Sequence, residues 1–343
     1  MRLGVLRRST PVEDSPIMRA AFIETLGPPE SIQYGELPLP APGPTDVLVN
    51  VTATTVNPVD TLLRAGIFRT PVAFPLVISR DLVGTVAAAG PGAPGFAVGD
   101  RVWSNSLGHG GRQGAAAERA VVAADRLYHL PAGVDPAEAV SMVHPAATAY
   151  LGLFTHGRVM AGETVLVAGA AGNVGSALVM LAAEAGARVI ATAAVQDLDH
   201  CRSLGAAEAF DYRHPKLAAL LRDTCPRGVD AYLDTSGQND LATAVELLAP
   251  RGRIVLLAVK QADPVLPARR LYMKDCSVVG FVISHATSNE LAEAAVTINR
   301  LLANGRLRPR TLERLPLSAA AEAHRRMELG ELHGRRLVLL PDA

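Results

Sequence analysis

Residues 163–205 constrain this chain more than any other segment, because they follow the order strand, tight turn, helix and strand. Residues 165–168 form an apolar run that is too short for a helix, whereas residues 176–185 have the apolar spacing of a helix that ends at Gly186. Residues 188–192 then supply a second strand. The segment therefore predicts a βαβ unit built on a buried parallel sheet.

The turn inside this unit is rich in glycine, which is typical of a dinucleotide site. Gly169, Gly172 and Gly175 allow a sharp turn, a close approach of backbone to a pyrophosphate, and tight packing of the helix on the strand. Free N–H groups at the helix start face the phosphates, and the helix dipole favours their negative charge. The motif reads Ala-x-Gly-x-x-Gly, with Ala170 at the position of the first glycine in the usual dinucleotide-binding motif. The alternative is an ordinary turn whose glycines serve packing alone.

Length and composition favour a globular protein of two domains. The 343 residues exceed one compact core of typical size, and a hydrophobic content of 49% can bury a large core. The 33 basic and 33 acidic residues cancel, so nothing points to nucleic acid or an anionic membrane as a partner. No apolar stretch approaches the roughly 20 residues of a membrane span. Three isolated cysteines fit a reducing compartment, and we expect a cytoplasmic protein.

The rest of the chain divides into segments that differ in composition and in apolar pattern. Residues 1–17 read as an irregular extension, and their acidic residues argue against a transit peptide. Short strands separated by turns follow, with an extended loop at residues 37–44, which predicts an antiparallel barrel. After Pro136 the pattern changes to helix and then to alternating strands and helices. The expected strands are residues 19–23, 46–53, 82–87, 101–103, about 117–122, 228–235, 252–258, 276–283 and 336–340, and the later helices are 241–248 and 288–304.

Five segments, taken in order, resemble the zinc-free medium-chain dehydrogenase/reductase superfamily, in its quinone oxidoreductase (ζ-crystallin-like) branch. They are residues 55–66, 99–102, 145–150, 169–175 and 228–235. The resemblance implies an α/β protein with NADPH bound between two domains. A GroES-like β-barrel catalytic domain would comprise residues 18–143 and 284–343, and a doubly wound Rossmann domain would comprise residues 144–283.

The metal-binding signature of the zinc-bearing branch is missing. That branch uses Gly-His-Glu and a four-cysteine lobe, whereas this chain has Ser79, Arg80 and Asp81 and a cysteine-free loop at residues 104–114. Lone histidines are more typical of loop or packing positions than of metal sites. We therefore expect no metal.

Asn57 is the candidate for the reaction site. It resembles the family's asparagine beside the nicotinamide and the substrate carbonyl, where an amide N–H can stabilise enolate charge. The alternative is an asparagine that caps the turn before Pro58. Asp60 and Arg64 have the spacing of an internal salt bridge on one helix.

Two further residues are candidates for the substrate pocket. Phe68 stands where some relatives carry a tyrosine, so it can wall a pocket but cannot donate a proton. His144 replaces an apolar residue of many relatives, and it is either a substrate contact or a satisfied histidine near a helix start.

The cofactor preference depends on the end of the second strand. A site for NAD places Asp or Glu about 20 residues past the glycines, but this position reads Thr192 and Ala193, which favours NADP. The family's lysine is absent, so Arg202, Tyr212 and Arg213 are the candidates for the 2′-phosphate, with solvated surface arginines as the alternative. The full expected set is Thr148, Gly169, Ala171, Gly172, Asn173, Val174, Gly175, Thr192, Ala193, Arg202, Tyr212, Arg213 and Thr235.

These features predict an NADPH-dependent oxidoreductase that transfers hydride to a quinone or an α,β-unsaturated carbonyl compound. The alternatives are an enoyl reductase of a biosynthetic pathway and a non-catalytic NADPH-binding protein. The apolar residues 276–283 predict an edge strand of the parallel sheet, and an uncovered edge favours pairing with a second copy. We therefore expect a homodimer joined through this strand.

Overall fold

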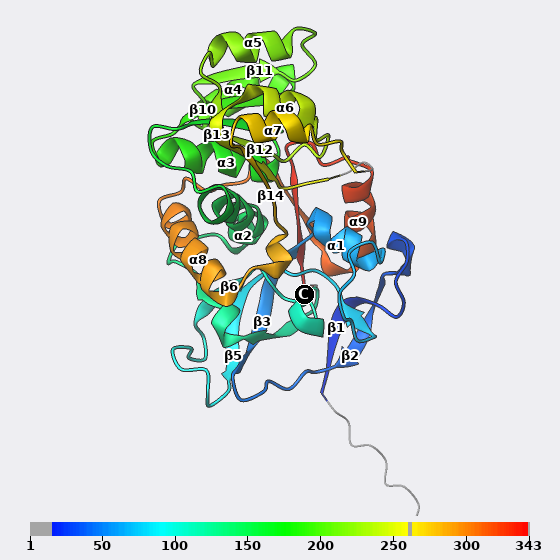
Figure 1. The fold of residues 1–343 in the computed structure, drawn as a ribbon. Helices are drawn as coiled ribbons and strands as arrows, with labels where there is room; N and C mark the ends of the chain where they lie inside the picture. The colour runs from blue at the N-terminus through cyan, green and yellow to red at the C-terminus, as the bar shows by residue number, and fades with distance from the viewer. Residues whose placement is uncertain (1–15, 260–262, 342–343) are drawn as a thin grey trace, which may run out of the picture.

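The computed structural model describes residues 16–259 and 263–341, which form a mixed barrel and a parallel sheet flanked by helices (Figure 1). The predicted α/β fold class is confirmed. Most of the predicted N-terminal extension lies outside the described residues, and the first strand already begins at Ile17.

The barrel domain contains a seven-stranded sheet of order β15-β16-β3-β5-β6-β8, with β7 paired to β3, and a three-stranded sheet of order β2-β1-β4. Only β15 and β16 run parallel in the large sheet. The strands are β1 (Ile17–Ile23), β2 (Gln33–Pro38), β3 (Asp46–Thr55), β4 (Leu76–Val77), β5 (Leu82–Ala89), β6 (Arg101–Ser104), β7 (Arg119–Ala123), β8 (Tyr128–His129), β15 (Leu312–Pro316) and β16 (Arg336–Leu340). The last strand thus returns to the first domain, as predicted.

The second domain is a six-stranded parallel sheet of order β11-β10-β9-β12-β13-β14. The strand order reverses between β9 and β12, and ligands of open α/β sheets bind at such a switch point. The strands are β9 (Thr164–Ala168), β10 (Arg188–Ala193), β11 (Glu208–Asp211), β12 (Val229–Asp234), β13 (Leu248–Leu256) and β14 (Ser277–Gly280). The helices between them are α3 (Asn173–Glu184), α4 (Leu198–Ser203), α5 (Leu217–Thr224), α6 (Leu241–Leu247) and α7 (Ala268–Met273).

Helix α2 (Pro136–Tyr150) joins the two domains through a shared apolar core. Asp135 caps its first turn by accepting from the Glu138 N–H, and most of its side chains are buried. One hydrophobic cluster runs from Trp103 of the barrel through α2 to β9 and to α8 (Ser288–Ala303). The Trp103 indole N–H also donates to Asn299 of α8 at 2.9 Å. Among the described residues, no helix is both long and apolar enough to cross a membrane.

Two departures from the predicted elements have physical causes. Residues 37–38 belong to β2 and not to a loop, because the register with β1 overrides the low strand propensity of a segment that contains Gly35 and Pro38. The predicted strand at residues 276–283 is too long, since β14 ends at Gly280 and a 3₁₀ turn follows at Ile283–His285.

Candidate functional site

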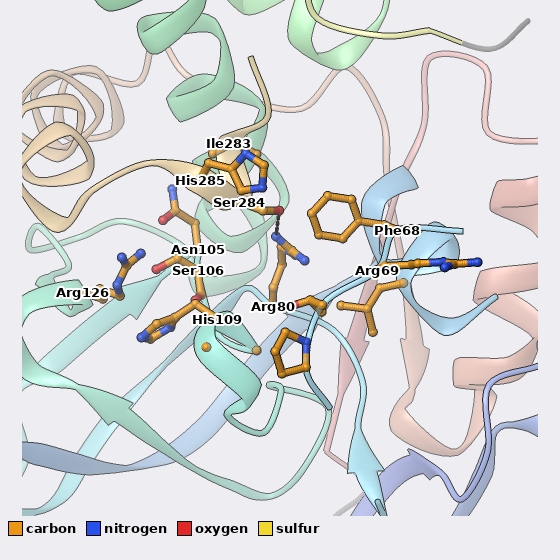
Figure 2. A pocket seen from close by; sticks show the side chains of 15 residues that line it. Phe68, Arg69, Arg80, Asn105, Ser106, His109, Arg126, Ile283, Ser284 and His285 are labelled. Carbon is orange, nitrogen blue, oxygen red and sulfur yellow. Dashed lines mark hydrogen bonds between the residues drawn. The ribbon is translucent and has the colours of Figure 1, made fainter. Parts of the chain in front are cut away.

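A cleft of about 250 Å³ lies where the barrel domain meets the segment that leaves the parallel sheet (Figure 2). Its lining comes from the chain after α1 (Pro58–Arg64), from Arg80, from the loop at residues 105–110 and from Ile283–His285. Phe68 lines the cleft, and its ring centroid lies 6.2 Å from that of His285. The cleft therefore combines an aromatic wall with several polar side chains.

A network of buried charges lies beside this cleft, beginning at α1. The Asn57 N–H donates to Asp60 Oδ2 at 2.8 Å, so the Asp60 carboxylate caps the helix that carries it. Asp60 Oδ1 accepts from Arg80 Nε at 3.2 Å. Burial raises the pKa of Asp60, while the Arg80 charge opposes that rise.

The predicted Asp60–Arg64 salt bridge is wrong. Asp60 turns back toward its own helix start and Arg80, whereas the buried Arg64 pairs with Glu328 of α9 (Ala320–Glu328) and donates to the Gly27 carbonyl. Spacing rules for an exposed helix do not apply, because both side chains are buried and tertiary partners are nearer.

Asn57 is 1% exposed, and both ends of its amide are occupied. Its Nδ2 donates to Asp81 Oδ2 at 2.7 Å, and its Oδ1 accepts from Arg336 Nη2 at 3.0 Å. Burial lowers the pKa of Arg336 to about 10, and the charges of Asp81 and Asp60 oppose that change. Asn57 thus begins α1 through its backbone and joins two opposite charges through its side chain, and it does not itself line the cleft.

His144 and Thr148 lie one turn apart on α2, and both are buried. His144 Nδ1 lies 3.2 Å from Asp81 Oδ1 and 3.3 Å from the Asn105 carbonyl. The Thr148 hydroxyl donates to the His144 carbonyl at 2.9 Å, a bond inside its own helix. His144 thereby connects the charge network to the loop that lines the cleft.

The glycine-rich turn has the shape that a phosphate cradle requires. Gly169 has a φ of +78°, and a Cβ there would lie 2.7 Å from the Thr235 hydroxyl. A Cβ on Gly175 would lie only 2.2 Å from the Gly169 carbonyl oxygen, so helix and turn touch backbone to backbone. Gly172 precedes α3, and no side chain caps that helix. The first-turn N–H groups of α3 are thus free of side-chain caps and follow a turn in which Gly169 and Gly172 lack Cβ atoms, and these residues fit a dinucleotide.

Candidate residues for the 2′-phosphate lie around the ends of β10 and β11. Tyr212 is half exposed, its N–H donates to the Ala193 carbonyl, and the Arg213 guanidinium stacks 4.9 Å above its ring. Arg202 is engaged elsewhere, since it pairs with Asp199 at 2.8 Å and donates to the Ala209 carbonyl. Thr192 and Ala193 are buried at the end of β10, while Ala171, Asn173 and Val174 are partly buried in the turn and first turn of α3.

The sequence reasoning passed over two charged residues at these sites. Asp197 is a buried carboxylate shortly after β10, bound by Arg310 and by His333 at 2.9 Å, both from the barrel domain. Asp197 lies near the sequence position of the acidic residue that binds the ribose in NAD sites, but its carboxylate is already paired with two side chains of the barrel domain. Arg80 was considered only as one of the residues that replace the Gly-His-Glu signature of the zinc-bearing branch. The adjacent Arg80 and Asp81 lie between two apolar runs, and charged residues in such a place are a signal of buried, paired charges that could have drawn attention to Arg80.

In the described ranges 16–259 and 263–341, no three His, Cys, Asp or Glu side chains gather as a metal site needs. The expectation of a metal-free site stays a prediction.

Comparisons with known proteins agree with the architecture. Residues 43–132 match the family "Alcohol dehydrogenase GroES-like domain", and residues 173–300 match "Zinc-binding dehydrogenase". The chain is 30% identical to a quinone oxidoreductase of Rattus norvegicus over 90% of this chain and 93% of that protein. A mycobacterial protein, Rv1454c, solved in complex with NADPH, superimposes with a TM-score of 0.82 at 29% identity, covering 94% of this chain and all of that one.

A further relative belongs to a much larger protein. The chain is 31% identical to a segment of a mycocerosic acid synthase-like polyketide synthase of Mycobacterium tuberculosis, over 98% of this chain but only 16% of the synthase.

Proposed function

The chain is an oxidoreductase of the zinc-free medium-chain dehydrogenase/reductase superfamily, in its quinone oxidoreductase branch, and from that we propose that it uses NADPH to reduce a quinone or an α,β-unsaturated carbonyl compound. The observation that carries the proposal is the glycine-rich turn at the switch point of a parallel sheet, in a chain whose barrel holds a separate cleft for a small molecule.

The proposed cofactor site uses residues of three strand ends. The N–H groups of the first turn of α3 and the glycines Gly169, Gly172 and Gly175 would hold the pyrophosphate. Tyr212 and Arg213 would face the 2′-phosphate. Of the nearby carboxylates, Asp197 is paired with Arg310 and His333, and Asp211 accepts from the Arg213 backbone N–H at 3.0 Å. When bound, the cofactor supplies a hydride from its nicotinamide ring. The protein's part is to bind, orient and exclude water.

In the substrate cleft, Phe68 would form the wall against the reducible ring or chain. We propose that Asn57 and His144 act by holding Asp81 and Arg336 in place beneath the cleft, because their side chains contact those residues directly. Thr148 would contribute to the nicotinamide end of the site.

An enoyl reductase of a biosynthetic pathway is the second candidate, and the similarity to the polyketide synthase segment supports it. A panel of quinones, enones and enoyl thioesters, with NADPH oxidation as the readout, separates the two. Turnover on quinones supports the first proposal, and turnover on enoyl thioesters alone supports the second. Cofactor binding without oxidation on any member of the panel would indicate a non-catalytic NADPH-binding protein.

We also propose a homodimer joined through β14. This strand is the last of the parallel sheet, and its outer edge carries no strand among the described residues. Exposed apolar side chains, Tyr272, Met273 and Val282, flank it on either side in the sequence. Pairing across a twofold axis would satisfy the strand edge and cover these side chains.

A further inference from the structure

We propose that Arg80 is a catalytic residue that stabilises the negative charge on the substrate's carbonyl oxygen during reduction. The proposal rests on the proposed function. Arg80 is 6% exposed, yet it lines the cleft, and its guanidinium lies between Phe68 and the Ile283–His285 turn in Figure 2. A buried cation that reaches a cleft is well placed to meet charge on a bound molecule.

Two of the three guanidinium nitrogens are fixed by the protein. Nε donates to Asp60 Oδ1 at 3.2 Å, and Nη1 donates to the Ser284 hydroxyl at 2.7 Å, the bond drawn dashed in Figure 2. Asp60 is itself held by the Asn57 N–H. Because α1 and the Ile283–His285 turn hold Arg80 from two sides, its orientation is set before a substrate arrives.

The third nitrogen, Nη2, has no hydrogen-bond partner within residues 16–259 and 263–341. Neighbouring polar atoms of the same cleft are in the same condition. The Asn105 side-chain oxygen and the Ser106 hydroxyl are buried without a hydrogen-bond partner among the described residues. Buried polar groups are normally paired, so a cleft with several unpaired ones is suited to a polar ligand.

An arginine suits the chemistry of the step. Hydride supplied by bound NADPH, which would be oxidised to NADP⁺ as its nicotinamide C–H bond breaks, would form a C–H bond at the β-carbon of an enone. The C=C electron pair would then shift so that the carbonyl oxygen becomes an enolate oxygen. Arg80 Nη2–H donates to that oxygen. A solvent proton then adds at the α-carbon, so the product gains one hydride and one proton. A guanidinium stays charged at all working pH values and donates without losing its proton. A preorganised donor of this kind acts mainly in the transition state.

The first test is kinetic. Arg80→Gln is expected to lower kcat by about 10²–10³ and to leave the dissociation constant of NADPH unchanged. Arg80→Lys keeps the positive charge but lacks the planar set of N–H donors of a guanidinium, so it should recover part of the lost kcat. Arg119→Gln, which removes an exposed arginine from β7 of the same domain, is the matched control. Equal kcat in Arg80→Gln and the unmodified protein would overturn the proposal.

The second test separates catalysis from folding. Arg80→Gln leaves the Asp60 carboxylate without its cation, so Arg80→Gln/Asp60→Asn is made as a neutral pair. If this double variant has the melting temperature of the unmodified protein and its kcat stays low, Arg80 acts on the reaction. If it melts normally and regains full kcat, Arg80 serves only to neutralise Asp60, and the proposal fails.

The third test needs no turnover. Phenolates resemble an enolate, so a series of phenols of falling pKa is titrated into the protein with oxidised cofactor. Affinity should rise as the phenols become more acidic, and Arg80→Gln should weaken phenolate binding about tenfold or more. An unchanged series in the variant contradicts the role of Arg80. If the unmodified protein reduces no substrate but still binds acidic phenols more tightly through Arg80, the proposed function is wrong and the proposed anion-binding role of Arg80 stands.

Discussion

At the residue scale, Asn57 links two buried charges of opposite sign. Asn57→Ala removes a donor from Asp81 and an acceptor from Arg336, so each group loses one of its buried partners. His144 remains beside Asp81, and Thr55 remains beside Arg336. Leaving a buried polar group unsatisfied costs about 1–3 kcal/mol. We expect urea unfolding to show a loss of that size, and turnover to fall more than NADPH affinity does. Unchanged stability would mean that Asp81 and Arg336 pair directly in the variant.

The 2′-phosphate preference also belongs to single residues. We expect NADPH to bind at least about tenfold tighter than NADH, or about 1.4 kcal/mol, because Arg213 and Tyr212 lie next to the end of β10. Tyr212→Phe combined with Arg213→Ala should narrow this gap and leave NADH affinity nearly unchanged. Arg222→Ala, at an exposed pair with Glu246, is the control. Titrations that give equal constants for both cofactors in the unmodified protein would refute this interpretation.

Single residues were also where the sequence was least informative. Phe68 could be placed by its position in a family pattern, and it does line a cleft. Arg80 and Asp197 could not, because their importance comes from partners far along the chain: Ser284 for the first, Arg310 and His333 for the second. Spacing within one segment cannot show which distant groups meet a buried charge.

At the scale of elements, the glycine-rich turn offers a matched pair of substitutions. A Cβ on Gly175 would lie 2.2 Å from the Gly169 oxygen and 2.8 Å from Ala170 Cα, so Gly175→Ala forces backbone apart. Overpacking of this kind costs about 1–3 kcal/mol. A Cβ on Gly172 would meet only the Gly169 oxygen, at 3.4 Å. We expect Gly172→Ala to retain its melting temperature but to bind NADPH more weakly, and Gly175→Ala to lose stability without any cofactor. Similar melting temperatures for both variants would contradict this difference.

Helix α9 carries a buried histidine that makes stability depend on pH. Neither ring nitrogen of His324 has a hydrogen-bond partner among the described residues. Burial, with a contribution from Arg64, lowers the pKa of His324 to about 3, well below its model-peptide value of about 6.5. The unfolded chain therefore gains a proton that the folded protein does not, and stability present above pH 6.5 is lost as the pH falls.

This linkage can be measured by urea unfolding at pH 6.5 and pH 5. The slope rises toward about 1.4 kcal/mol per pH unit as the unfolded histidine becomes fully protonated, which predicts a loss of about 1.6 kcal/mol from this group over that interval. His324→Leu should remove that part of the slope, whereas His214→Gln, at an exposed position, should not. An unaltered slope in His324→Leu would show that the ring finds a partner when it is charged.

Elements were predictable where their pattern is local. The βαβ unit and the helix α8 follow apolar spacing closely, and their bounds differ from the expected ones by a few residues. Strand β15 escaped prediction because it is short, and two adjacent charged residues lie between its leucines in a strand that is not deeply buried. Its partner β16 holds it in place, which is information that lies outside the segment itself.

At the scale of the whole molecule, the proposed dimer is open to direct measurement. Light scattering at micromolar concentration should give twice the mass of one chain. Val282→Lys places a charge beside the β14 edge and should shift the protein toward monomer, while Val296→Lys, at an exposed position on α8, should not. A monomeric mass for the unmodified protein would remove the proposal.

The predicted division into two domains came from the order of segments that resemble the family, and its boundaries stay a prediction. The patterns alone did not show that the domains share one apolar core, because that core combines Trp103, α2, β9 and α8, which are distant in sequence. Long-range packing of this kind depends on the complete tertiary arrangement.

The position of β16 has a consequence for how the protein is made. This strand lies between β15 and β3, and Thr55 donates to the Leu337 carbonyl across the sheet. The strands of the parallel sheet, by contrast, all lie between residues 164 and 280. Because chains are synthesised from the N-terminus and domains fold as units, the parallel sheet can assemble while the ribosome is still at work. The barrel contains the first strand of the described residues, β1, and is nevertheless the last part to close.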